Sequence, residues 1–148
     1  MLQKAIYLDM DGTIADLYAV PNWLWSLRAF KADPYRTAPP MMRMNRLARV
    51  LNRLQRQGYT IGIVSWLSKE PNPYFDNAVI KAKMDWLAEH LHSVQFDEIH
   101  IIAYGTPKSS VVKFPNGILF DDEEQNREEW KGLACEPTEM LELLRTLL

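Results

Sequence analysis

Short apolar runs alternate along the chain with segments in which apolar residues recur every three to four positions. The runs at 5–8, 60–64, 98–103 and 117–120 are rich in β-branched or aromatic residues and predict buried strands; residues 133–135 predict a short fifth. Buried parallel strands read as continuous apolar runs, whereas half-exposed antiparallel strands alternate apolar with polar residues. The pattern therefore favours a parallel sheet.

Apolar residues at helical spacing occupy 44–57 and 76–91, and shorter helices are expected over 123–131 and from Thr138 to the end. Gly58 is a natural stop for the first helix, and Asp76, after Pro71 and Pro73, is a plausible N-cap for the second. Strands separated by helices of this length predict an α/β fold of three layers, α/β/α, of the Rossmann-like, doubly wound kind. All 148 residues are expected to form one domain.

Residues 14–40 do not fit this alternation. The segment is rich in aromatic residues and ends in a cluster of prolines. We expect a small insert there, one helix plus a loop, over the end of the first strand. Its aromatic side chains either pack on the core or, in the case of Trp23 and Trp25, stack on the base of a substrate.

Composition limits the class of protein. Apolar residues make up 47% and charged residues 24%, which is typical of a globular chain and excludes a disordered one. The single cysteine excludes a small domain that depends on disulfides. The net charge of −2, from 17 basic and 19 acidic residues, gives no overall attraction to nucleic acid or to an anionic membrane. No run resembles a signal peptide or a membrane span, so we expect no membrane partner and a cytoplasmic location.

Pairs of carboxylates follow two of the predicted strands. Asp9 and Asp11 stand two residues apart where the first strand ends, and Gly12 permits the chain to turn sharply there. Asp121 and Asp122 close the fourth strand in the same way. If the two strands are parallel neighbours, the four acids meet at one edge of the sheet, where chemistry gathers in open α/β folds. Acids brought together repel unless a cation or a shared proton compensates, and Mg²⁺ prefers oxygen ligands.

Alternative interpretations remain for each residue alone. Asp9 and Asp11 could simply form a turn, and Asp121 or Asp122 could cap the following helix. Ser65 follows the second strand and Lys108 follows the third, but either could be an ordinary surface residue, with Lys113 a nearby competitor of Lys108. Together they are harder to explain as structural or surface residues.

The ordered set resembles the four motifs of the haloacid dehalogenase superfamily: Asp9-x-Asp11-Gly12-Thr13, then Ser65, then Lys108, then Asp121-Asp122. The resemblance covers nearly the whole chain from Ile6 onward. It implies a Mg²⁺-dependent phosphatase that hydrolyses a phosphate monoester through an aspartyl-phosphate intermediate. The expected substrate is a small phosphorylated metabolite or a nucleotide.

The family's roles carry over residue by residue. The resemblance implies that Asp9 is the nucleophile and that Asp11 protonates the leaving oxygen and then activates water. Ser65 and Lys108 would bind the phosphoryl group, with Gly12, Thr13 and Trp66 beside it. Metal binding is assigned to Asp9, to the Asp11 backbone carbonyl and to Asp121 and Asp122, of which we favour Asp122 as the direct ligand.

The segments 64–66, 81–87 and 120–122 are similar to the 5′(3′)-deoxyribonucleotidase-like branch, although Glu123-Glu124 and the short insert depart from it. A short insert leaves the site more open, or dependent on a lid from another subunit; the oligomeric state is not predicted. Two alternatives stay open: a phosphatase acting on a macromolecule, such as a nucleic-acid end or a phosphoprotein, and a non-catalytic binding protein of the same fold.

A stripe of arginines lies opposite the apolar face of the helix at 44–57. Its members are Arg43, Arg46, Arg49, Arg53 and Arg56. Such a stripe is most simply a solvated face, and contact with a nucleic acid is the less favoured interpretation. Salt-dependent binding to DNA or RNA would distinguish them.

Overall fold

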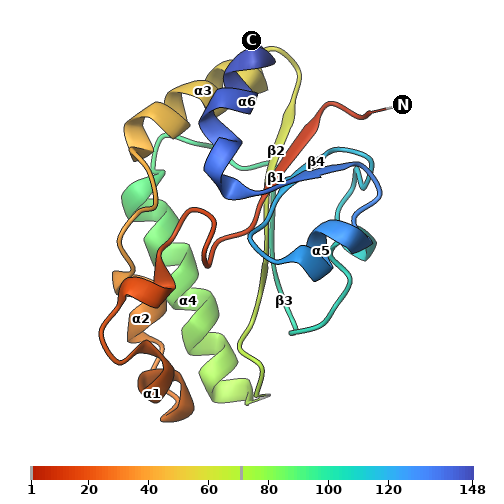
Figure 1. The fold of residues 1–148 in the computed structure, drawn as a ribbon. Coiled ribbons are helices and arrows are strands. Elements are labelled where there is room, and N and C mark those ends of the chain that lie inside the picture. Colours follow the sequence, from red (N-terminus) through yellow and green to blue (C-terminus); the bar gives the residue numbers. More distant parts are fainter. Residues whose placement is uncertain (1, 71) are drawn as a thin grey trace.

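The computed structural model describes residues 2–70 and 72–148 and has a parallel sheet at its centre (Figure 1). Five strands pair in the order β3-β2-β1-β4-β5, all parallel. Their bounds are β1 Ala5–Leu8, β2 Thr60–Trp66, β3 Glu98–Ile102, β4 Ile118–Phe120 and β5 Leu133–Cys135. The predicted parallel α/β sheet is confirmed, and Ser65 and Trp66 are the last two residues of β2 rather than the first beyond it.

Helices cover both faces of the sheet, as a three-layer fold requires. They are α1 Trp23–Arg28, α2 Asp33–Thr37, α3 Met44–Arg56, α4 Pro73–His90, α5 Glu124–Glu129 and α6 Met140–Thr146, with 3₁₀ turns at Leu17–Ala19, Lys108–Ser110 and Pro137–Glu139. Alternate residues of β1 face opposite layers. Ile6 and Leu8 pack in one core cluster with residues of α3, α4 and α6, whereas Ala5 and Tyr7 pack in another with Val112 and Trp130.

Helix α4 begins three residues earlier than the sequence analysis predicted, and Asp76 is not its N-cap. Asn72 is the N-cap, and its side chain accepts hydrogen bonds from the backbone N–H groups of Tyr74 and Phe75. Pro73 occupies the first helical position, where a missing N–H costs nothing because it would have no intrahelical partner. Pro71, expected as a helix breaker, lies outside the described residues.

The insert at 14–40 contains two short helices rather than one helix and a loop. Helix α1 gives way at Phe30, which has a positive φ of 57°, and Pro34 falls in the first turn of α2, where proline is tolerated. The two ends of the insert are held together, since Asp16 N–H donates to Pro39 O at 2.8 Å. Its apolar side chains pack on the N-terminal half of α4 around Leu17, Tyr35 and Val79.

The last two helices are shorter than expected. Helix α5 ends at Glu129 because Trp130 leaves the helix, packs on the sheet and donates its Nε1–H to Gly117 O at 2.8 Å. Helix α6 begins at Met140, after the 3₁₀ turn that starts at Pro137. Across the described residues, the helices all fall short of the length and apolar character that a membrane span needs.

Candidate active site

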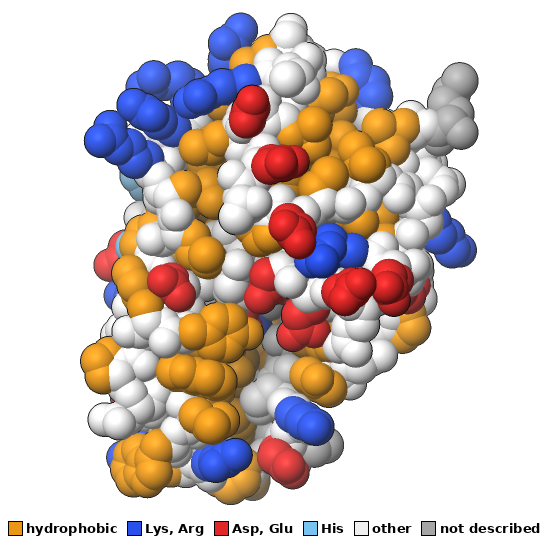
Figure 2. Space-filling model, viewed as in Figure 1, with side chains coloured by type: hydrophobic (Ala, Val, Ile, Leu, Met, Phe, Trp, Pro, Cys, Tyr) orange, Lys and Arg blue, Asp and Glu red, His pale blue; other side chains and the backbone are white. Residues whose placement is uncertain are grey.

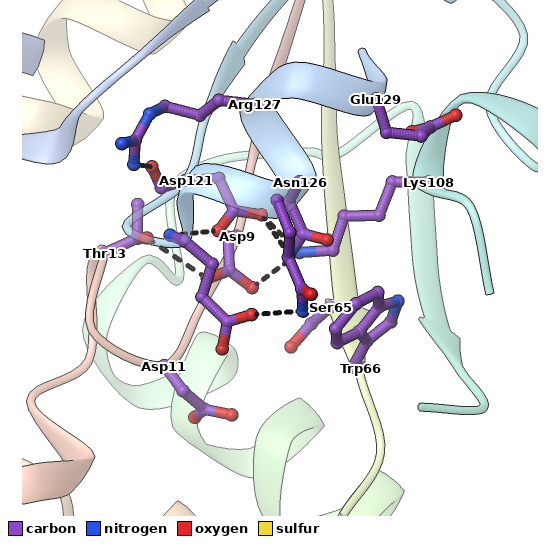
Figure 3. Close-up of polar contacts among 12 residues, drawn as sticks. Asp9, Asp11, Thr13, Ser65, Trp66, Lys108, Asp121, Asn126, Arg127 and Glu129 are labelled. Carbon is purple, nitrogen blue, oxygen red and sulfur yellow. Dashed lines mark hydrogen bonds and ion pairs between the residues drawn. The ribbon is translucent and has the colours of Figure 1, made fainter. Parts of the chain in front are cut away.

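Three carboxylates converge at the carboxyl edge of the sheet, and Figure 3 labels two of them, Asp9 and Asp121. β1 pairs in parallel with β4, so Asp9, directly after β1, lies beside Asp121 and Asp122, directly after β4. The backbone ties these ends together, since Asp9 N–H donates to Phe120 O at 3.0 Å. One oxygen from each of the three carboxyl groups lies within 4.8 Å of the others. The convergence expected from the sequence is therefore present for these three acids.

A tight turn follows Asp9 and shapes its surroundings. The N–H groups of Thr13, Ile14 and Ala15 all donate to Met10 O, and Gly12 has a φ of 78°, which favours glycine. A Cβ at Gly12 would overlap the Asp122 carboxylate, so only glycine lets the turn approach that group. The buried Thr13 hydroxyl donates to Asp9 Oδ2 at 3.2 Å. Gly12 and Thr13 thus position Asp9 and Asp122.

Lys108 supplies a buried cation to the cluster. Its Nζ lies 3.0 Å from Asp9 Oδ1 and 2.6 Å from Asp121 Oδ2 (Figure 3). Burial by itself would lower the pKa of Lys108, but the Asp9 and Asp121 carboxylates outweigh it and raise that pKa. Lys108 is therefore a fixed positive charge against Asp9, and Lys113, the competing candidate, is not part of this cluster.

Asp121 and Asp122 have different surroundings. Asp121 is fully buried; its oxygens accept from Lys108 Nζ, from Asn126 Nδ2 at 3.1 Å and from Glu123 N–H at 3.0 Å. Burial, and then the Asp9 carboxylate, raise the pKa of Asp122 to about 8. The Asp121 oxygens thus already accept hydrogen bonds from three donors, including Lys108. Asp122 instead lies beside the Asp9 carboxylate, whose negative charge disfavours ionisation of Asp122.

The cluster fits a hard divalent cation. It offers only carboxylate oxygens, which suit Mg²⁺ and not the softer metals that prefer sulfur or imidazole. The raised pKa of Asp122 beside Asp9 reflects two like charges with too little compensation, which a cation would remove. Asp9 and Asp122 are the members of the cluster best placed to hold one.

The Asp11 carboxylate lies apart from this cluster and pairs with a residue that the sequence analysis did not single out. Lys83 Nζ lies 2.9 Å from Asp11 Oδ2, and it also donates to Ser65 Oγ and Trp66 O, each at 2.7 Å. Burial raises the pKa of Asp11, and the Lys83 ammonium opposes that shift. The Asp11 carboxyl therefore lies with Lys83 rather than with the other three acids; its role in proton transfer and a metal contact through its backbone carbonyl both stay predictions.

Lys83 was missed although the sequence carried a signal. It stands four residues after Val79 and four before Leu87, on the apolar face of α4, and it is fully buried. A lysine at a core position of an amphipathic helix needs a buried partner, and Asp11 is that partner. Asn126 of α5 donates to Asp121 and is not among the candidates of the sequence analysis, because nothing in a short polar helix marks which residue turns inward.

A cavity of about 440 Å³ opens beside these residues, between the insert and the sheet edge. Asp9, Asp11, Trp66 and Lys108 reach its wall, so the structure brings these four expected site residues together there. Ser65 is buried behind them and meets the site through Lys83. Gly12 and Thr13 line a separate hollow on the far side of Asp122, so direct contact of these two with substrate stays a prediction.

The stripe of five arginines, four in α3 and Arg43 at its N-cap, lies on the outer face of the molecule. All are exposed, and basic side chains gather over that helix at the upper left of Figure 2. Arg46, Arg49 and Arg53 meet Arg145 of α6 around a shallow hollow separate from the cavity of the candidate site. The arrangement is that of a solvated basic face, and nucleic-acid binding there stays an untested hypothesis.

The fold has counterparts among solved phosphatases, although no family model and no curated protein matches the sequence. D,D-heptose 1,7-bisphosphate phosphatase from B. bronchiseptica, crystallised with magnesium and phosphate, is similar with a TM-score of 0.64 and 14% identity, over 99% of this chain and 100% of that chain. The corresponding enzyme from Burkholderia thailandensis is similar with a TM-score of 0.52 and 15% identity, over 85% and 70%. At such low identity the likeness concerns the fold, and it confirms the predicted α/β architecture.

Proposed function

We propose that this chain is a Mg²⁺-dependent phosphatase that hydrolyses a phosphate monoester of a small molecule through an aspartyl-phosphate on Asp9. The observation that carries the proposal is the environment of the Asp9 carboxylate, which lies at a cavity wall between the Lys108 ammonium and the Asp122 carboxylate. The shared fold supports it, since the B. bronchiseptica phosphatase was crystallised with magnesium and phosphate.

In the first step an Asp9 carboxylate oxygen forms a bond to phosphorus while the bond from phosphorus to the leaving oxygen breaks. Asp11 gives its proton to that oxygen, so the product leaves as an alcohol. Burial raises the pKa of Asp11, which favours the protonated acid that this step needs. Lys83 holds the Asp11 side chain from behind.

In the second step Asp11, now a carboxylate, takes a proton from water while the water oxygen bonds to phosphorus. The bond between phosphorus and Asp9 breaks, which releases phosphate and leaves Asp9 as a carboxylate and Asp11 protonated, as at the start. Lys108 stabilises the negative charge on the phosphoryl oxygens and on Asp9 throughout. Asp9 and Asp122 would hold Mg²⁺, which when bound offsets the charge on the phosphoryl group and lets an anionic substrate approach these carboxylates.

Hydrolysis of p-nitrophenyl phosphate with and without Mg²⁺ tests the proposal. We expect turnover that requires Mg²⁺ and is lost in Asp9→Asn while the circular dichroism spectrum is unchanged. Asp16→Asn is the matched control, because Asp16 follows the same turn and its side chain makes no capping hydrogen bond. Turnover in Asp9→Asn at the wild-type rate, or none in the wild type with any phosphate monoester, would overturn the proposal.

A further inference from the structure

The cavity beside Asp9 and Lys108 has walls that suit a particular kind of leaving group. Asp9, Asp11 and Lys108 form the charged cluster at one end of the cavity. Most of the remaining lining is aromatic or aliphatic and comes from the insert and from the ends of β2 and β3. Figure 2 shows apolar side chains gathered over the insert beside a hollow, with acidic side chains along its upper margin. A substrate whose phosphate reaches Asp9 must place the rest of its structure between these walls.

Two aromatic pairs stand at this cavity. Tyr18 and Trp23 of the insert pack edge to face with ring centroids 5.0 Å apart, and Trp66 and Tyr104 of the core pack with centroids 4.7 Å apart. All four side chains line the cavity. The two pairs come from segments far apart in the chain, so the cavity has an aromatic contribution from the insert and another from the sheet.

Both pairs adjoin the charged end of the cavity. The Lys108 ammonium lies 5.6 Å from the centroid of the Trp66 ring, which is itself fixed by a 2.8 Å hydrogen bond from its Nε1–H to Thr106 O. The Tyr18 ring stands against the turn after β1, because a Cβ built on Gly12 would lie 3.1 Å from Tyr18 Cε2 and would also meet the Asp122 carboxylate. A ring held by either pair is therefore near the phosphoryl position.

The walls suit a leaving group rich in hydroxyls less well than they suit a flat ring. Such a group would lose its hydrogen bonds to water on entering and would regain only part of them, from Ser68, Asn126 and the hydroxyls of Tyr18, Tyr35 and Tyr104. Away from the charged cluster and Glu123, the charged groups of the lining are Arg28, Lys69 and Glu70, and all three are exposed. A flat apolar ring, in contrast, gains from burial and from stacking on aromatic faces.

We propose, on the premise of the phosphatase activity above, that the substrate is a phosphate monoester whose leaving group carries an aromatic ring, such as the base of a nucleoside monophosphate. The bisphosphorylated sugar named for the two similar structures is the opposite kind of leaving group, so this chain differs from them in substrate class. The Tyr18–Trp23 pair and the Trp66–Tyr104 pair form the ring-binding part of the site.

Esters of primary alcohols test this inference, because their leaving oxygens are similar in reactivity. We expect kcat/KM for benzyl phosphate and for a nucleoside 5′-monophosphate to exceed that for glycerol 3-phosphate by at least about 10-fold, as stacking on aromatic side chains predicts. Equal or higher kcat/KM for glycerol 3-phosphate would overturn the inference and leave the phosphatase proposal intact.

Two tryptophans on α1 provide a matched pair of variants. Trp23 lines the cavity, whereas Trp25 is 63% exposed, packs under the Lys31 ammonium and does not line it. In Trp23→Leu the ratio of kcat/KM for benzyl phosphate to that for glycerol 3-phosphate should fall about 10-fold, mainly through KM, and in Trp25→Leu it should stay at the wild-type value. An unchanged ratio in Trp23→Leu, or equal falls in both variants, would contradict the assignment.

A binding measurement separates the inference from the catalytic proposal. Benzylphosphonate and ethylphosphonate cannot be hydrolysed, and their binding in the presence of Mg²⁺ can be followed by isothermal titration calorimetry. We expect benzylphosphonate to bind at least about 10-fold more tightly than ethylphosphonate, and Trp23→Leu to remove most of that preference. If no ester were hydrolysed but this preference held, the phosphatase proposal would fail and the ring-binding site would stand; equal affinities would overturn the ring-binding site.

Discussion

Lys83 Nζ lies 2.9 Å from Asp11 Oδ2, and the same ammonium group donates to the Ser65 hydroxyl. The pair joins α4 to the turn after β1, across 72 positions of the chain. Because Lys83 is fully buried, its ammonium group finds its hydrogen-bond partners inside the protein, at the Asp11 carboxyl, the Ser65 hydroxyl and Trp66 O, rather than in water. The proton-transferring carboxyl of the proposed mechanism is thereby held in one orientation.

Replacing Lys83 should impair proton transfer to the leaving group. We expect Lys83→Met to lower kcat for an alkyl phosphate by about 100-fold, the size of a general acid's contribution, and to lower it much less for p-nitrophenyl phosphate. The difference arises because p-nitrophenolate leaves without needing a proton. Steady-state kinetics on both substrates, with a thermal melt to verify folding, would measure it.

Lys81→Met is the control for that variant. Lys81 lies one position before Ala82 on the same helix, but its side chain is 78% exposed and pairs only with Asp85. Exposed pairs of this kind contribute little, so the control should retain wild-type kinetics. Equal losses on the two substrates in Lys83→Met would indicate a purely structural role for this lysine.

The two acids after β4 should respond differently to removal of their charge. Asp122→Asn is expected to raise the Mg²⁺ concentration for half-maximal activity by at least about 10-fold, since it removes a proposed ligand. Asp121→Asn should mainly lower the rate at saturating Mg²⁺, because Lys108 loses its 2.6 Å partner. Mg²⁺ titrations of activity measure both effects. The opposite pattern would make Asp121 the direct ligand and assign the orienting role to Asp122.

Mg²⁺ should stabilise the protein more at alkaline than at acidic pH. The pKa of Asp122 is raised from 3.8 to about 8, so between those values the folded protein holds a proton that the unfolded chain has lost. The stability of the metal-free protein should therefore fall as the pH rises through this window. Mg²⁺ replaces that proton and removes the repulsion between Asp122 and Asp9.

Thermal melts with EDTA or Mg²⁺ at about pH 5 and about pH 8 would measure this linkage. The shift in Tm caused by Mg²⁺ should be larger at the higher pH in the wild type. This difference should shrink in Asp122→Asn, where Asp121, with a pKa raised to about 6, is left to contribute. A shift of equal size at both pH values in the wild type would show that Asp122 does not exchange a proton for the metal.

Local patterns were enough to predict the parallel sheet and the meeting of Asp9 with Asp121 and Asp122. Continuous apolar runs identified β1 and β4, and residues that follow adjacent parallel strands share one edge of the sheet. Lys108 was also found in this way, because it follows a strand within a few residues. These residues could be predicted because each follows the end of its strand by only a few positions in the sequence.

Contacts between distant segments were less accessible to sequence reasoning. The spacing of Lys83 from apolar residues of α4 hints at burial, but only the packing of α4 against the sheet shows it to be fully buried beside Asp11. The two helices of the insert were predicted as one, because the end of α1 depends on the left-handed conformation of Phe30, which its residue type disfavours. The burial of Lys83 and the end of α1 both depend on tertiary packing rather than on the conformational preferences of the local sequence.

Phosphoryl transfer to Asp9 is tested most directly by trapping the covalent intermediate. Asp11→Asn cannot activate water, so a phosphoryl group transferred from p-nitrophenyl phosphate should persist on the protein long enough for acid quenching and peptide mass spectrometry. We predict an adduct of one phosphoryl group, mapped to Asp9 and absent from the double variant that also carries Asp9→Asn. Turnover of the ester by the wild type, with no adduct on Asp9 and full activity in Asp9→Asn, would contradict the account.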